Sequence, residues 1–260
     1  MIEQDIKSRA ALCASAIVAL NVLAFIYLRI AGSEDIASLI NAWAFSPRTT
    51  IDLFKEGQII TALTIIEKST FCHLTPAHLL SNLIPIYLFA VVIAREKSTG
   101  EFLKVYFLGG LMAALATTLL SFWQVIPING ASGAAAALYG YYAGLRLIPR
   151  SKQERLQALL MPVITFAFLA AGLALKLPVD SPAAAAYLFA VLLFCAGLFS
   201  GRIEELWLPA IALWVLGNTY DLFMTGLDIY ATGSAHLLHL TGFASGLALC
   251  LKASAAERAA

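Results

Sequence analysis

The sequence predicts an all-α polytopic membrane protein with about eight transmembrane helices in a single membrane domain, residues 1–260. Hydrophobic residues make up 60% of the chain and charged residues only 13%, which lies outside the usual composition of soluble globular domains. Several stretches of about 20 residues lack Asp, Glu, Lys and Arg, and a helix of this length crosses the hydrocarbon core. The net charge of +1 gives no indication of a nucleic-acid-binding surface.

The apolar runs give the expected spans in order along the chain. The run 105–145 is too long for one crossing, and the segment "VIPING" divides it into two helices, because proline and glycine break helices. The seventh span contains Asp221. The expected spans are 10–28, 78–94, the two helices within 105–145, 156–175, 181–201, 206–227 and 229–251.

The distribution of basic residues predicts that both termini lie in the cytoplasm. Cytoplasmic segments carry an excess of Lys and Arg, and this orientation puts twelve of the 17 basic residues inside and five outside. The twelve are Lys7, Arg9, Arg95, Lys97, Lys104, Arg146, Arg150, Lys152, Arg155, Arg202, Lys252 and Arg258, and the five are Arg29, Arg48, Lys55, Lys68 and Lys176. A cleaved signal peptide over residues 1–32 is the rival interpretation, which the length of the apolar stretch and the absence of an A-x-A site disfavour. We expect an integral protein of a bacterial inner membrane.

The outer segment between the first two spans, residues 32–72, mixes apolar and polar positions at helical spacing. The clearest examples are "IASLINAWAF" and "IDLFKEGQIITALTII". This pattern predicts helices that lie in the membrane interface rather than cross it. Trp43 suits that depth.

Polar residues on three separate spans fall at the same expected depth, near the outer membrane face. They are Ser132, the pair His78 and Asn82, and the pair His236 and His239. Taken singly, each has a structural explanation, since serine among small residues packs helices and buried amides or imidazoles bond to neighbouring helices. Their coincidence in depth indicates a site, because polar groups within spans are costly and usually face a partner or a cavity.

These residue types fit nucleophilic catalysis. A serine hydroxyl becomes an effective nucleophile when a histidine within hydrogen-bond reach accepts its proton. Ser132 is expected at the start of a helix, where unpaired backbone N–H groups can hold an oxyanion. His78 and Asn82 are four residues apart, so both lie on one face of a helix and can donate to the same developing charge.

Four motifs, in this order along the chain, resemble the rhomboid family of intramembrane serine proteases. "HLLSN" at 78–82 is similar to the family's H-x-x-x-N element, and "EKSTG" at 96–100 to its E-x-x-x-G turn. "GASG" at 130–133 is similar to the G-x-S-G box, and "HLTGFASG" at 239–246 to H-x-x-G-x-x-x-G. The resemblance covers about residues 57–148 and 206–252.

The resemblance implies a serine endopeptidase with a six-helix core, about 10–148 and 206–252, and an inserted helical pair, about 156–201. It implies Ser132 as nucleophile and His239 as base, with His78 and Asn82 holding the oxyanion and no metal or cofactor. The supporting residues that it implies are His73, Gly130, Gly133, Glu96, Gly100, Gly242 and Gly246. Glycines in the last span would let it pack closely against the small-residue face of the span that begins near Ser132.

Three points of the site stay open in the sequence. His236 is the alternative base, one turn from His239, although only His239 has the two following glycines in register. Asp221 is a candidate third catalytic residue, but its expected place at the end of a span favours a dyad without it. The aromatic residue that the family usually has one turn after the serine is Ala136 here, so packing under the histidine must come from elsewhere.

The expected partners are the lipid bilayer and single-span transmembrane protein substrates, cleaved near the outer membrane face, and no nucleic acid. A substrate must first leave its helix there, because a helical carbonyl is hydrogen-bonded and shielded. The alternative function is a proteolytically inactive rhomboid-like protein that binds transmembrane helices, which the Ala136 departure favours. A transporter would predict internal repeats with broken helices, and the sequence shows no convincing repeat.

Overall fold

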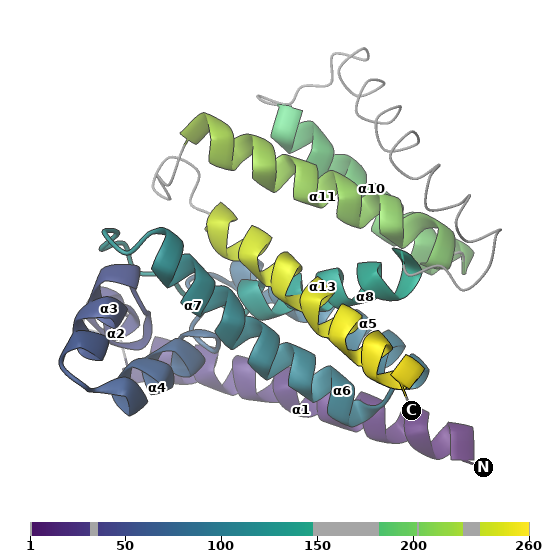
Figure 1. Ribbon diagram of the computed structural model, residues 1–260, viewed down its shortest axis with the longest axis horizontal. Coiled ribbons are helices and arrows are strands. Elements are labelled where there is room, and N and C mark those ends of the chain that lie inside the picture. The colour runs from purple at the N-terminus through teal and green to yellow at the C-terminus, as the bar shows by residue number, and fades with distance from the viewer. Residues whose placement is uncertain (1, 32–35, 148–181, 202, 226–234, 260) are drawn as a thin grey trace. The chain divides into compact units, whose positions relative to one another are not determined.

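The computed structural model describes residues 2–31, 36–147, 182–201, 203–225 and 235–259, and these are mainly helical (Figure 1). The all-α prediction is therefore confirmed for this part of the chain, where one isolated antiparallel bridge joins Phe45 to Ile128. The chain forms two compact units, one of Met1–Tyr142 with Thr241–Ala260 and one of Ala143–Leu240, and each is described by itself. The expected span 156–175 lies outside the described residues.

Four of the described helices are long and apolar enough to cross a membrane. Helix α1 (Ile2–Ala31), helix α5 (Pro76–Glu96) and helix α13 (His236–Ala259) provide three of them. The fourth is Thr99–Leu120, in which α6 (Thr99–Lys104) continues through a π-helical turn (Val105–Gly109) into α7 (Gly110–Leu120). The count of eight spans and the orientation of the termini stay predictions.

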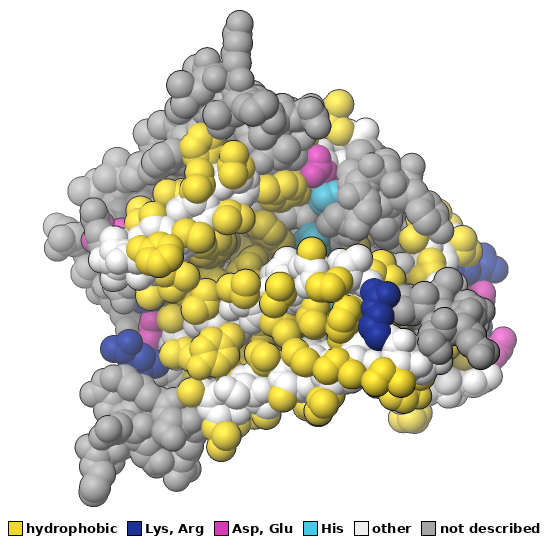
Figure 2. Space-filling view, turned by 180° about the vertical axis from the view of Figure 1, so that it is seen from behind, with side chains coloured by type: hydrophobic (Ala, Val, Ile, Leu, Met, Phe, Trp, Pro, Cys, Tyr) yellow, Lys and Arg dark blue, Asp and Glu magenta, His cyan; other side chains and the backbone are white. Residues whose placement is uncertain are grey.

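The surface of these helices is apolar, as a lipid-facing surface must be. Figure 2 shows hydrophobic side chains over most of the coloured surface on one face of the molecule. On α1, Leu12 and Ile30 expose 71% and 72% of their area, which would be costly in water. Together with the four spans, this surface is that of an integral membrane protein.

The predicted helices of the outer segment are present as α2 (Ile36–Trp43), α3 (Pro47–Lys55) and α4 (Ile59–Ser69). Figure 1 shows them grouped beside the end of α7. Phe45 exchanges two backbone hydrogen bonds with Ile128, with N···O distances of 3.1 and 2.7 Å. The outer segment is thus tied to the loop that precedes Ser132. Its location in the membrane interface stays a prediction.

In the first unit, α13 and α8 (Ser132–Leu147) pack backbone against backbone through glycines. A Cβ placed on Gly242 would lie 2.5 Å from the Gly133 carbonyl oxygen. Cβ atoms placed on Gly140 and Gly246 would collide with the carbonyl oxygens of Phe243 and Ala137. The glycines of the last span predict this close approach, and the structure has it.

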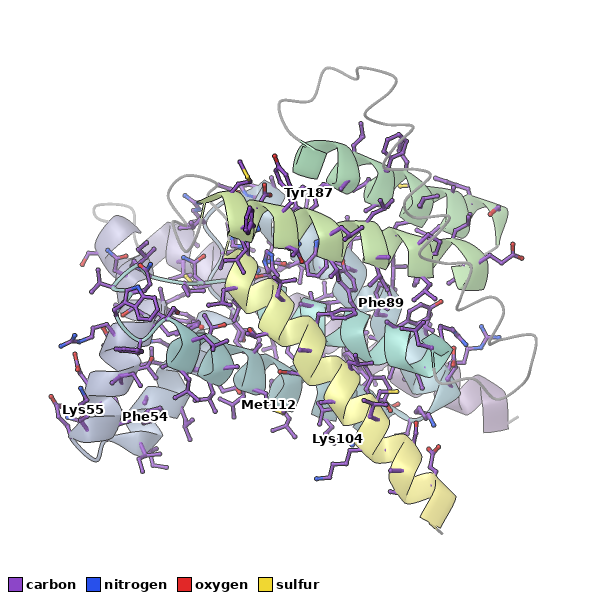
Figure 3. The ribbon with its side chains drawn as sticks, turned by 45° about the horizontal axis from the view of Figure 1, so that its top comes forward. Phe54, Lys55, Phe89, Lys104, Met112 and Tyr187 are labelled. Carbon is purple, nitrogen blue, oxygen red and sulfur yellow. The ribbon has the colours of Figure 1, made fainter. Side chains whose placement is uncertain are left out.

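The second unit contains a pair of helices that pack side by side, α10 (Pro182–Ser200) and α11 (Ile203–Thr225) (Figure 1). A small buried cluster holds them together, formed by Ala190, Leu193, Ala210 and Leu213. Tyr187 of α10 lies against α11 (Figure 3), where a Cβ on Gly217 would lie 2.7 Å from the tyrosine ring. The expected span 206–227 is helical as far as Thr225 and includes Asp221.

Candidate active site

Ser132 is the first residue of α8, as the sequence predicts. The Ala131 carbonyl accepts the first helical hydrogen bond, from Ala135 N at 2.9 Å, so the N–H groups that follow have no partner within the helix. Gly130 turns the chain into this helix with a φ of 97°, a left-handed conformation that favours glycine. Its N–H donates to the Ser69 carbonyl at 2.9 Å, which fixes the loop to the end of α4.

The first turns of α5 bring His78 and Asn82 to this loop. Thr75 caps the helix by accepting from His78 N at 3.1 Å, and Pro76 occupies the first helical position, where it needs no N–H partner. A Cβ on Gly130 would lie 2.6 Å from His78 Nε2 and 3.3 Å from Asn82 Nδ2. Both side chains therefore meet the backbone immediately before Ser132.

His73 links Asn82 to the same loop. Its Nε2 lies 3.0 Å from Asn82 Nδ2 and accepts from Ala131 N at 3.4 Å. Because a backbone N–H can only donate, this nitrogen is an acceptor and the amide group of Asn82 donates to it. Burial lowers the pKa of His73 from 6.5 to about 4, and the neighbouring His78 ring adds to the effect, so His73 is neutral at physiological pH.

The second unit holds His236 and His239, both bonded to one amide of α11. Asn218 Oδ1 lies 3.0 Å from His236 Nδ1 and 2.7 Å from His239 Nδ1. The Trp214 ring packs on His239, with ring centroids 5.4 Å apart. An aromatic ring beside this histidine thus comes from α11.

Asp221 lies beside His236 in the second unit. The Asp221 Oδ2 lies 3.8 Å from His236 Nε2. The same oxygen accepts a hydrogen bond from the hydroxyl of Tyr187 at 3.0 Å (Figure 3). The acid is therefore part of the His236 surroundings. The expectation of a dyad without Asp221 stays a prediction.

The supporting residues differ in how closely other atoms surround them. Gly133, Gly242 and Gly246 are where the backbones of α8 and α13 meet. Ala136 is completely buried, with its Cβ 2.9 Å from a Cβ built on Gly242, so α13 occupies the space that a larger side chain would need. Glu96 ends α5, and Gly100 lies in the next helix, where an added Cβ would meet only Ser98 Oγ, at 3.8 Å.

In the described part of the chain, no three His, Cys, Asp or Glu side chains group so as to hold a metal ion. All four cysteines are free thiols: Cys13, Cys72, Cys195 and Cys250. Burial raises the pKa of Cys72 to about 11, despite the opposing charge of Lys68, so this thiol is protonated.

Asn218 and Trp214 were not identified from the sequence. Both lie in "WVLGNTYDLF", the segment that also contains Asp221. A polar side chain in an apolar helix is a general signal of a partner or a site, and Asn218 carries that signal. The partner itself depends on how α11 packs against the start of α13, which no local pattern encodes.

Comparison with known families matches residues 56–201, more than half of the chain, to the Rhomboid domain. The matched region contains Ser132, His78 and Asn82, and it ends before His236 and His239. It also runs through residues 156–201, for which the sequence analysis expects an inserted helical pair. No curated protein matches the sequence.

Proposed function

Because this chain belongs to the rhomboid family, we propose that it is an intramembrane serine endopeptidase with Ser132 as nucleophile and His239 as base. The family includes serine intramembrane proteases and inactive members, so membership alone does not decide between them. One observation carries the proposal. Within the first unit, His78, Asn82 and His73 all converge on the two residues that precede Ser132.

Side chains placed in this way can donate hydrogen bonds to an oxyanion and stabilise it. In the proposed reaction, Ser132 Oγ attacks a peptide carbonyl and the carbonyl oxygen becomes negatively charged. Asn82 Nδ2 carries two N–H bonds, so donation of one to His73 leaves the second for the oxyanion. His78 Nε2 and the Ser132 N–H are the other proposed donors. Donors fixed in this way commonly contribute about 10²–10³ in kcat each.

The face of α13 favours His239 over His236 as the base. Gly242 and Gly246 define the side of α13 that packs on α8. At about 100° per residue, His239 lies roughly 40° from the mean direction of these glycines, and His236 roughly 100° from it. His239 accepts the Ser132 proton, passes it to the leaving amine, and then activates the water that hydrolyses the acyl-enzyme.

The Trp214 contact weakens the main argument for an inactive protein. That argument is the absence of an aromatic residue at Ala136, and Trp214 supplies a ring beside His239.

The proposed substrates are single-span membrane proteins whose helix unwinds near the outer membrane face. The proposal includes eight spans with both termini in the cytoplasm and a place in the bacterial inner membrane, supported by the distribution of Lys and Arg.

A fluorophosphonate probe on the purified protein in detergent tests the proposal. We expect labelling of wild type and His236→Ala, and none of Ser132→Ala or His239→Ala. Ser81→Ala is the matched control, because it removes an exposed hydroxyl of α5 that donates only to the His78 carbonyl in the described contacts. A folded wild type that neither labels nor cleaves a single-span substrate would refute the protease and leave the helix-binding function.

A further inference from the structure

One buried amide holds both histidines of α13. Asn218 exposes only 1% of its area, and its Oδ1 is shared by His236 Nδ1 and His239 Nδ1. Its other end is also engaged, since Nδ2 donates to the Trp214 carbonyl at 2.9 Å. All of these contacts lie within the second unit.

The Trp214 carbonyl decides which way the amide faces. A carbonyl oxygen only accepts hydrogen bonds, so the amide nitrogen must face Trp214 and the amide oxygen must face the histidines. An amide oxygen also only accepts, so each histidine must present a protonated Nδ1 to it. In a neutral imidazole with its proton on Nδ1, the lone pair is on Nε2.

We infer that Asn218 is a positioning residue that fixes His239 as the Nδ1–H tautomer, so that Nε2 is the nitrogen that receives the Ser132 proton. This inference rests on the proposed function. The aspartate of a Ser-His-Asp triad performs the same orienting task, and an asparagine that presents its NH₂ group instead holds the wrong tautomer. Here the Trp214 carbonyl prevents that reversed orientation.

The surroundings of His239 are consistent with an uncharged orienting group. A carboxylate in this position would need burial of a full charge, whereas the amide supplies only its dipole. Among the described residues, the carboxylate of Asp221 approaches the other histidine, with 3.8 Å between its Oδ2 and His236 Nε2. The Trp214 ring packs on His239, so residues 214 and 218, one turn apart on α11, together set its orientation.

The test reads the tautomer directly, by nitrogen-15 NMR of histidine-labelled protein in detergent, with each resonance assigned by single substitution. Wild type should show His239 protonated on Nδ1 and unprotonated on Nε2. Asn218→Leu removes the acceptor at similar volume and should populate the Nε2–H tautomer. Thr219→Val is the matched control on the same helix, since its hydroxyl donates to the Val215 carbonyl.

Kinetics separate a positioning role from a merely structural one. Asn218→Leu should lower kcat about 10²-fold or more with little change in KM, because the base loses its correct form. Asn218→Asp keeps an acceptor for His239 Nδ1, so its kcat should exceed that of Asn218→Leu, while its unfolding temperature should fall because it buries a charge and loses the donor to the Trp214 carbonyl. It should also move the acidic limb of the pH–rate profile to higher pH, because a carboxylate favours the imidazolium.

Two results would overturn the inference, provided that thermal unfolding shows each variant to be folded. One is an unchanged Nδ1–H tautomer of His239 in Asn218→Leu, and the other is an unchanged kcat in that variant. Failure of the proposed function gives a different result, because wild type itself would then lack probe labelling while the tautomers remain readable by NMR.

Discussion

Replacing Gly130 with alanine tests whether the loop before Ser132 and the start of α5 form one site. Ordinary van der Waals contact begins at 3.4 Å, whereas the new Cβ would lie 2.6 Å from His78 Nε2. The imidazole ring must therefore move by about 0.8 Å, the difference of the two distances, and a displacement of that order costs about 10²-fold in rate. The left-handed φ of 97° adds about 1–2 kcal/mol of destabilisation.

A matched glycine separates these two effects. Gly57 also has a positive φ, of 76°, but a Cβ there would meet nothing within 4 Å. Gly57→Ala should therefore lower the unfolding temperature without lowering kcat on a single-span substrate, whereas Gly130→Ala should lower both. In a His78→Ala background the collision is removed, and Gly130→Ala should cost little further activity. Equal kcat values for Gly130→Ala and Gly57→Ala would refute the reasoning.

Two further predictions concern stability, measured by thermal unfolding in detergent. Gly246→Val should destabilise the protein by at least about 2 kcal/mol, because its side chain would collide with the Ala137 backbone. Gly100→Ala, at a glycine with open space around it, should be nearly neutral. Equal effects of the two substitutions would contradict the close packing of α8 and α13. The pKa of His73 is 6.5 in the unfolded chain and about 4 in the folded protein. The free energy of unfolding is therefore undiminished above pH 6.5 and decreases as the pH falls below that value. The loss should be about 2 kcal/mol by pH 5. His73→Gln should lack this part of the pH dependence, and an unchanged dependence would show that His73 is not its source.

Local signals were sufficient for the elements of the candidate site that lie in the first unit. "VIPINGAS" places the end of a loop and the start of a helix at Ser132, and α8 begins there. The Thr75-Pro76 pair is an N-cap followed by a first-turn proline, and α5 begins at that proline. Helical spacing then puts His78 and Asn82 on one face, which is the face that meets Gly130.

The contacts around His239 depend on packing between helices and could not be read from local patterns. The sequence shows Ala136 in place of an aromatic residue, but it does not show that Trp214 provides a ring instead. The same holds for Asn218, whose acceptor role depends on the Trp214 carbonyl in the turn before it. The π-helical turn Val105–Gly109 was also not anticipated, since it differs from an α-helix by one hydrogen-bond register.

The glycine contact between α8 and α13 limits which amino-acid substitutions these two helices can accept. Where side chains meet, one can shrink while its neighbour grows, but Gly140 and Gly246 meet the carbonyl groups of Phe243 and Ala137, which every amino acid shares. No compensating substitution exists for such a contact, so these positions should tolerate almost no replacement in a mutational scan. The contact also freezes no rotamers on folding, because glycine has none to lose. Gly100 and Gly57, with open space around them, should accept many residues in the same scan, with Gly57 limited only by its backbone conformation.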